Sequence, residues 1–235
     1  MNAPPFSRMV PIRRADGTPV TNFVSAPTWK DLKAGKTDAV TTIDPAEILA
    51  EEHHRAYGRP WVIGRCYFDY LIQNGLQPQD KVLDLGCGAG RVGIWLIPFL
   101  ETGNYYGIDH HLATLAAFAG YECAIHDLFG KSPNLMLDDE FRVEHFNARF
   151  DVVLDLYVSA HLQLAARERL YRRLASACAP GARVFVPHKP KLPLLLLQDL
   201  GFHLVKVEKV EYPILRGIDV DFESRDKWHE FRFAP

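Results

Sequence analysis

Lys81–Gly93, KVLDLGCGAGRVG, is the stretch that decides the fold. Its first half holds an apolar run, residues 82–85, typical of a strand that is covered on both faces. Glycines then stand at alternate positions, and a helical pattern begins at residue 92. Glycine allows a tight turn and a close approach of backbone N–H groups to a ligand, and a helix start attracts anions and polar groups. The stretch therefore predicts a strand, a turn and a helix that together bind a ligand.

Two cofactor classes use such a turn, and the glycines fit both. Gly88, Gly90 and Gly93 spell G-x-G-x-x-G, the dinucleotide fingerprint, which is weak evidence by itself. The segment from Asp84 to Gly90, DLGCGAG, spells acid-x-G-x-G-x-G and resembles the class I methyltransferases that use S-adenosylmethionine (AdoMet). A carboxylate beside a pyrophosphate raises the cost of binding, whereas AdoMet carries an ammonium and a sulfonium. Asp84 therefore favours AdoMet.

A second acid follows the next predicted strand. Residues 105–108 form a short β pattern that ends at Asp109, 21 positions after Gly88. A spacing of about 20 residues is usual for an acid that accepts hydrogen bonds from ribose hydroxyls. Asp109 is also placed to cap the helix expected from Leu112, and one carboxylate is able to do both.

Length and composition narrow the class of protein. The 235 residues suffice for one α/β domain with a short extension. The net charge of -2 gives no general attraction to nucleic acid or an anionic membrane. No signal-peptide core or membrane-length apolar segment is evident, so we expect a cytoplasmic protein. The cysteines lack C-x-x-C and zinc spacings, which indicates reduced thiols; they are Cys66, Cys87, Cys123 and Cys178.

The pattern of the chain predicts an arm followed by one domain. Residues 1–44 hold five prolines and few periodic apolar positions, so we expect an extended N-terminal arm. Residues 45–235 are predicted to form a single domain, in which N-terminal helices within 45–78 cover the cofactor edge. Strands are expected at 82–85, 105–109, 134–137, 150–154, 183–186, 202–210 and 227–233, and helices at 64–75, 112–131, 168–177 and 192–200.

This order of elements predicts the fold class. Strands that alternate with helices imply right-handed crossovers and a parallel sheet. The last two strands have no helix between them, which implies antiparallel pairing. We therefore predict an α/β protein: a Rossmann-like three-layer sandwich with a mostly parallel seven-stranded sheet and an antiparallel last strand.

From about Arg59 onward, the chain resembles the class I AdoMet-dependent methyltransferases, especially small-molecule and sugar-type members. The resemblance is carried by LDLGCGAGR, YYGID, FDVVLDLYVSAHL, APGARVFV and LGFHLVKVE. It implies that Asp109 holds the ribose. It also implies that the methionine portion of AdoMet lies against Asp84, Gly86, Cys87, Gly88 and Gly90.

The acid that binds adenine is less defined by the resemblance. One candidate is Asp127 in CAIHDLF, and the other is the pair Asp138 and Asp139 after NLML. In related enzymes only a short connection separates the adenine-binding turn from the fourth strand. The distance to FDVV therefore favours the pair.

Methyl transfer is an in-line displacement, so the protein must align the acceptor and, for a hydroxyl, accept its proton. Candidate bases lie where strands end. Asp155 ends the fourth strand, His161 follows it six positions later, and His188 follows the fifth strand. Asp155 is also a candidate contact for the methionine portion. Each has a structural alternative: charge balance for Asp155, hydrogen-bonded packing for His161 and a surface loop for His188.

The sequence thus predicts an AdoMet-dependent methyltransferase acting on a small molecule, with no nucleic acid or membrane partner. Enzymes that methylate exocyclic or amide nitrogens share an N/D-P-P-Y turn, which residues 155–158, DLYV, lack. This difference favours a hydroxyl acceptor. No metal-binding motif is evident, so we expect displacement without metal. The alternatives are a non-enzymatic AdoMet-binding protein and, less favoured, a nicotinamide-dependent oxidoreductase; the oligomeric state is not predicted.

Overall fold

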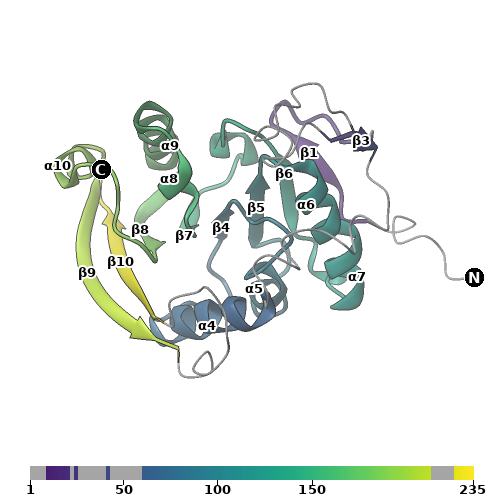
Figure 1. Ribbon diagram of the computed structural model, residues 1–235, viewed down its shortest axis with the longest axis horizontal. Helices are drawn as coiled ribbons and strands as arrows, with labels where there is room; N and C mark the ends of the chain where they lie inside the picture. The colour runs from purple at the N-terminus through teal and green to yellow at the C-terminus, as the bar shows by residue number, and fades with distance from the viewer. Residues whose placement is uncertain (1–8, 22–23, 26–40, 43–59, 213–224) are drawn as a thin grey trace, which may run out of the picture.

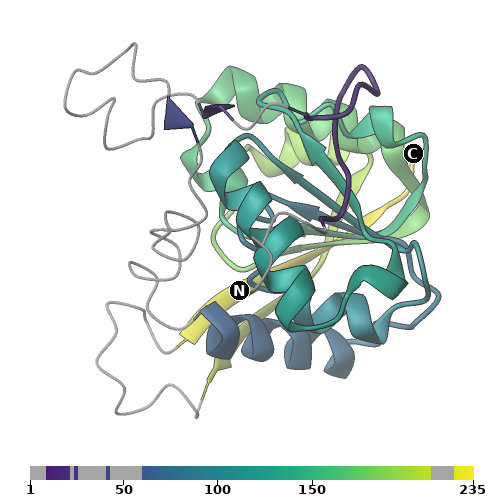
Figure 2. The ribbon, with the colours of Figure 1, turned by 90° about the vertical axis from the view of Figure 1, so that its right-hand side faces the viewer.

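The structure is a computed structural model, which describes residues 9–21, 24–25, 41–42, 60–212 and 225–235. In this part of the chain, an eight-stranded sheet lies between two layers of helices (Figure 2). The strand order is β1-β6-β5-β4-β7-β8-β10-β9. A separate two-stranded ladder pairs β2 (Val24–Ser25) with β3 (Thr41–Thr42). Any helix expected between residues 45 and 59 lies outside the described residues.

The five central strands run parallel and lie within a residue or two of the predicted positions, except that the last begins five residues earlier (Figure 1). Every residue of the middle strand, β4, is buried, as expected for a strand covered by helices on both faces. Parallel strands end at the same edge, so the acids predicted from their ends come together there. The strands are β4 (Val82–Leu85), β5 (Tyr105–Asp109), β6 (Asn134–Leu137), β7 (Phe150–Asp155) and β8 (Cys178–Val186).

The two C-terminal strands confirm the predicted antiparallel last strand. β9 (Phe202–Glu211) and β10 (Arg225–Phe233) pair antiparallel with each other. β10 also pairs antiparallel with β8, so it lies between β8 and β9, and β9 forms the edge of the sheet. This placement is visible in Figure 1, where the two long strands curve away from the rest of the sheet.

An eighth strand lies at the opposite edge of the sheet. β1 (Ile12–Arg14) pairs parallel with β6, with Ile12 opposite Leu135. It comes from the segment that we expected to form an arm, so the sheet has one strand more than the seven predicted. Only Ile12 of its three residues is buried, and such a short segment has no alternating pattern to read. The boundary at residue 44 stays a prediction.

Helices cover both faces of the sheet and form two apolar cores with it. The predicted helix at 112–131 is in fact divided by a π-helical turn, a feature that is rare and often found at functional sites. One face carries α4 (Pro60–Gln73), α5 (Gly93–Phe99), α6 (Leu112–Ala116), the π-helix η2 (Ala117–Glu122) and α7 (Cys123–Ile125). The other carries η4 (Val143–Phe146), α9 (Leu164–Ala177) and α10 (Leu194–Asp199).

Candidate active site

The glycine turn after β4 has a left-handed backbone at three positions, with φ of 62° at Gly86, 54° at Gly88 and 83° at Gly90. A Cβ at Gly86 would lie 2.3 Å from Cγ2 of Val158, and one at Gly90 would lie 2.4 Å from the ring of Phe118. Packing therefore requires these two glycines. A Cβ at Gly88 would have no atom nearer than 3.9 Å. The middle of the turn is thus an open cradle that a side chain would fill.

Asp84 lies beneath this turn and is 1% exposed. Burial raises its pKa to about 7, although a hydrogen bond from the Tyr105 hydroxyl, 2.7 Å long, favours the charged form. A cationic ligand group would favour ionisation of this carboxyl. The neighbouring Cys87 is also buried, and burial raises the pKa of its thiol, so it is not a reactive thiolate.

Asp109 connects the end of β5 to the glycine turn. One carboxylate oxygen accepts the N–H of Gly88 and the other accepts the N–H of His111, each at 2.8 Å. A carboxylate has further lone pairs after accepting two hydrogen bonds. The ribose-binding role of Asp109 is consistent with this position and stays a prediction.

A cavity of about 410 Å³ opens beside Asp109, where β1, β5 and β6 end. This volume is within the range of small-molecule sites. Asp138 and Asp139 line it, whereas Asp127, in the turn after α7, does not. The structure thus brings the favoured adenine acids to the cofactor edge, and their role stays a prediction. The lining residues are Arg14, Ala15, Asp16, His110, His111, Leu112, Leu137, Asp138, Asp139 and Arg142.

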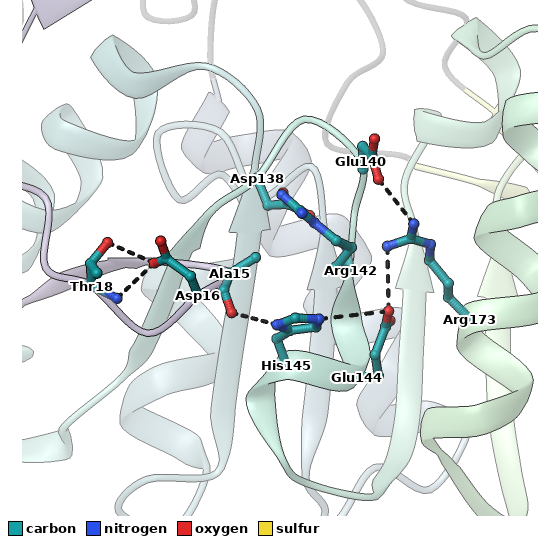
Figure 3. Close-up of polar contacts among 9 residues, drawn as sticks. All are labelled: Ala15, Asp16, Thr18, Asp138, Glu140, Arg142, Glu144, His145 and Arg173. Atoms are coloured by element: carbon teal, nitrogen blue, oxygen red, sulfur yellow. Dashed lines mark hydrogen bonds and ion pairs between the residues drawn. The ribbon is translucent and has the colours of Figure 1, made fainter.

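Arg142 holds Asp138 in place (Figure 3). Its backbone N–H and its Nε donate hydrogen bonds to the Asp138 carboxylate, at 2.6 and 3.0 Å. Burial opposes ionisation of Asp138, but these contacts outweigh it and lower the pKa. The backbone N–H of Asp138 donates to the carbonyl of Asp109 at 2.9 Å, which joins the two acids. No sequence motif identifies Arg142, because its contact with Asp138 depends on the shape of the turn after β6.

The open cradle, the buried acid below it and the adjoining cavity have the chemistry that AdoMet requires. Residues 83–184 match a protein family described as a methyltransferase domain. The matched residues run from β4 into β8 and include the glycine turn. This match, together with the fold and the chemistry of the glycine turn, supports an AdoMet-dependent methyltransferase with AdoMet as its cofactor. The dinucleotide interpretation is less favoured, because the buried carboxyl of Asp84 lies below the turn and would raise the cost of binding a pyrophosphate.

Solved structures share the fold of the methyltransferase at low sequence identity. Magnesium protoporphyrin IX methyltransferase (ChlM) from Synechocystis PCC 6803, with bound AdoMet, has a TM-score of 0.56 and 18% identity over 88% of this chain and 91% of that one. N-methyltransferase NodS from Bradyrhizobium japonicum WM9, bound to S-adenosylhomocysteine (SAH), has a TM-score of 0.54 and 14% identity over 73% and 87%. The [4+2]-cyclase SpnF has a TM-score of 0.54 and 15% identity over 73% and 81%. The similarity defines the fold and leaves the acceptor open.

Asp155, at the end of β7, is completely buried in the region where we expect the acceptor to bind, which we call the acceptor side. One carboxylate oxygen accepts the N–H of Ser159 in α8 (Val158–His161), and the other accepts the hydroxyl of Tyr171 in α9, both at 2.9 Å. Asp155 therefore ties β7 to two helices. Its carboxylate is buried and both of its oxygens already accept hydrogen bonds, so the geometry favours a positioning role over proton transfer.

Arg167, a residue that the sequence analysis did not identify, holds the same region from α9. Its side chain is 7% exposed, and its guanidinium donates to the carbonyls of Ser159, Leu162 and Lys191. The Nζ of Lys191 donates in turn to the carbonyl of Ala160 at 2.9 Å. These bonds join α8 to the loop after β8, although Ala160 and Lys191 are 31 positions apart in sequence.

The two histidine candidates have different surroundings. His161 is exposed at the end of α8. His188 is partly buried, and its Nδ1 lies 3.1 Å from the carbonyl of Lys189. A carbonyl only accepts hydrogen bonds, so this contact requires the proton on Nδ1 and leaves the lone pair on Nε2. Nε2 is shielded from solvent and has no hydrogen-bond partner among the described residues.

Tyr157 and His229 complete the surroundings of His188. The ring of Tyr157 lies 5.2 Å from that of His188 at an angle of 31°, and Tyr157 has a left-handed φ of 73°. Such a conformation is unusual for a residue with a side chain and is often found at functional sites. His229 on β10 is opposite Val186, and burial lowers its pKa.

Two further observations concern the described residues alone. No three histidine, cysteine or acidic side chains among them form a group able to hold a metal ion. No helix in the described ranges is both long enough and apolar enough to cross a bilayer.

Proposed function

We propose that this methyltransferase transfers the methyl group of AdoMet to a hydroxyl oxygen of a small molecule, by direct displacement without a metal, and that His188 accepts the hydroxyl proton. The observation that carries the proposal is the unpartnered Nε2 of His188 in the loop after β8. A hydroxyl group is able to donate its proton to such a lone pair.

The small-molecule class is supported by two of the fold neighbours, which carry names of enzymes that act on small molecules: magnesium protoporphyrin IX methyltransferase and the cyclase SpnF. The chain has no excess of positive charge for nucleic acid, with a net charge of -2. Its four cysteines are buried and unpaired, which agrees with a cytoplasmic enzyme.

AdoMet supplies the methyl group and a sulfonium leaving group that keeps the electron pair of the broken C–S bond. The protein holds the acceptor in line with that bond, which removes much of the entropic cost of the reaction. Nε2 of His188 takes the hydroxyl proton, while the Lys189 carbonyl keeps the other ring proton on Nδ1. Tyr157 limits rotation of the His188 ring by packing against it.

His188 is preferred over the other two candidate bases on geometric grounds. Asp155 would have to break two hydrogen bonds in a fully buried environment. His161 is exposed, so its ring is in contact with water and is less well oriented than that of His188. Both stay predictions, and the experiment below tests His161.

The test is a panel of small alcohols, phenols, amines and thiols incubated with AdoMet that carries a ¹³C-labelled methyl group. The chemical shift of the labelled carbon in the product shows whether oxygen, nitrogen or sulfur received it. We expect an O-methyl product, a kcat at least a hundredfold lower for His188→Gln, and little change for His161→Gln as the matched control.

Three results would contradict parts of this proposal. An N-methyl or S-methyl product would exclude the hydroxyl acceptor. A kcat that falls for His161→Gln and not for His188→Gln would move the base to α8. Tight SAH binding without transfer to any acceptor would favour the non-enzymatic AdoMet-binding protein.

A further inference from the structure

The N-terminal strand brings a turn to the cofactor edge, from outside the methyltransferase domain match at 83–184. In β1, Arg14 is opposite Leu137, the last residue of β6. Because the two strands are parallel, the residues after Arg14 emerge on the same side as Asp138. Ala15 and Asp16 therefore reach the cavity beside Asp138 and Asp139, and all of these residues line it.

This turn is held rigidly by its own hydrogen bonds. The backbone N–H groups of Arg14 and Gly17 donate to the carbonyls of Thr18 and Arg14, at 2.8 and 2.9 Å. Both the N–H and the hydroxyl of Thr18 donate to the Asp16 carboxylate, at 2.9 and 2.6 Å. Gly17 has a φ of 83°, which suits the tight reversal. A rigid turn is able to serve as a wall, since it does not need to be ordered when a ligand binds.

A second contact fastens the turn to the domain. The carbonyl of Ala15 bonds to Nδ1 of His145 in η4, as Figure 3 shows. Figure 3 also shows the turn on one side of this region and the pair of Asp138 and Arg142 on the other. The space between them is part of the cavity described above.

The cavity has the chemistry of a site for a flat heterocycle. Ala15, Leu112 and Leu137 provide apolar surface, and Nε2 of His111 is shielded from solvent without a hydrogen-bond partner among the described residues. Burial lowers the pKa of His111, so its ring is neutral and able to pair with an uncharged polar edge. A purine base combines apolar faces with such an edge.

We infer that the turn Arg14–Thr18 forms the outer wall of the adenine pocket, so that a strand outside the methyltransferase domain match determines the affinity for the adenosine portion of the cofactor. The inference concerns the cofactor and is independent of the acceptor. It makes β1 a part of the binding site in addition to an edge of the sheet.

The test measures the affinity of adenosine and of SAH for the full chain by isothermal titration calorimetry. In Ala15→Leu, the larger side chain enters the cavity while β1 and the turn remain. We expect both ligands to bind at least tenfold more weakly and by the same factor, because they share the adenine base. Glu140→Gln is the matched control: it weakens the contact with Arg173 shown in Figure 3, touches neither the turn nor the cavity, and should leave both affinities unchanged.

A second variant removes the fastening contact instead of filling the cavity. His145→Ala should weaken adenosine binding severalfold, with a thermal unfolding midpoint measured in parallel to confirm that the protein is folded. Unchanged adenosine affinity in both variants would overturn the inference. A loss confined to SAH would also overturn it, because it would place the effect at the methionine end of the cofactor.

Discussion

The cofactor side and the acceptor side of this site are built in different ways. On the cofactor side, Asp84 and the glycine turn lie within seven consecutive residues, and Asp109 joins them from the neighbouring strand. On the acceptor side, α8 has only four residues and is held by Asp155 and by the buried Arg167. The cofactor side therefore depends on local backbone shape, whereas the acceptor side depends on contacts between distant segments.

The largest expected effect is the pH dependence of stability that Asp84 imposes on the cofactor side. Its pKa is raised from 3.8 to about 7 in the folded protein, so the folded state binds more protons than the unfolded state between these values. The free energy of unfolding therefore falls as pH rises through this window, by about 4 kcal/mol in total, and is level above it.

Urea unfolding of the protein without cofactor at pH 4 to 8 measures this slope. In Asp84→Asn, the free energy of unfolding should fall less between pH 4 and pH 7 than in the unsubstituted protein. The control is Asp199→Asn at an exposed position, which should leave the pH dependence unchanged. If the free energy of unfolding depended on pH equally in all three proteins, Asp84 would remain charged in the folded protein. Its burial would then not destabilise the cofactor side at neutral pH.

The second effect concerns the packing of the glycine turn. Gly90→Ala forces a Cβ to within 2.4 Å of the Phe118 ring at a left-handed φ of 83°. Overpacking and backbone strain together should lower the free energy of unfolding by about 3 kcal/mol. Urea unfolding of both proteins at one pH measures this loss in the free energy of unfolding. A loss below about 1 kcal/mol would mean that the turn adapts easily and that the cofactor side does not depend on local backbone shape.

The third effect tests whether the two sides are separable. Arg167→Met keeps the length of the side chain but leaves the carbonyls of Ser159 and Lys191 without their donor, which should cost about 2 kcal/mol of stability. Because these carbonyls belong to the acceptor side, we expect SAH affinity to change less than twofold. A large loss of SAH affinity would show that the cofactor side also depends on Arg167.

The smallest expected effect separates binding from folding within the turn. Gly88→Ala places a Cβ in open space, 3.9 Å from the nearest atom, so its cost in stability is limited to the left-handed backbone, about 1 kcal/mol. The same methyl group occupies the cradle, and SAH should bind about tenfold more weakly, measured by calorimetry. Unchanged SAH affinity would show that the ligand does not approach the turn at this position.

The sequence was most informative where structure depends on neighbours in the chain. Glycines and a buried acid define the turn after β4, and the fixed spacing to Asp109 reflects one crossover between adjacent strands. The parallel sheet and its antiparallel last strand followed from the order of apolar runs. These features need no knowledge of distant contacts.

The remaining features depend on partners far away in the sequence. β1 has three residues, and its strand pairing arises from β6, more than a hundred residues later. Arg167 belongs to a charged helix in which it looks like one more solvent-facing residue, yet it is buried against the loop after β8. Asp155 was identified by its position at a strand end, but its bond to Tyr171 was not visible in any motif.

The position of β10 affects how the chain folds as it is synthesised. Among the described strands, β9 pairs in the sheet only with β10, which emerges from the ribosome after it. Until then, both β8 and β9 expose unpaired backbone N–H and C=O groups, and such edges are prone to association with other chains. In the interval between translation of β9 and translation of β10, these edges are therefore exposed to association with other chains.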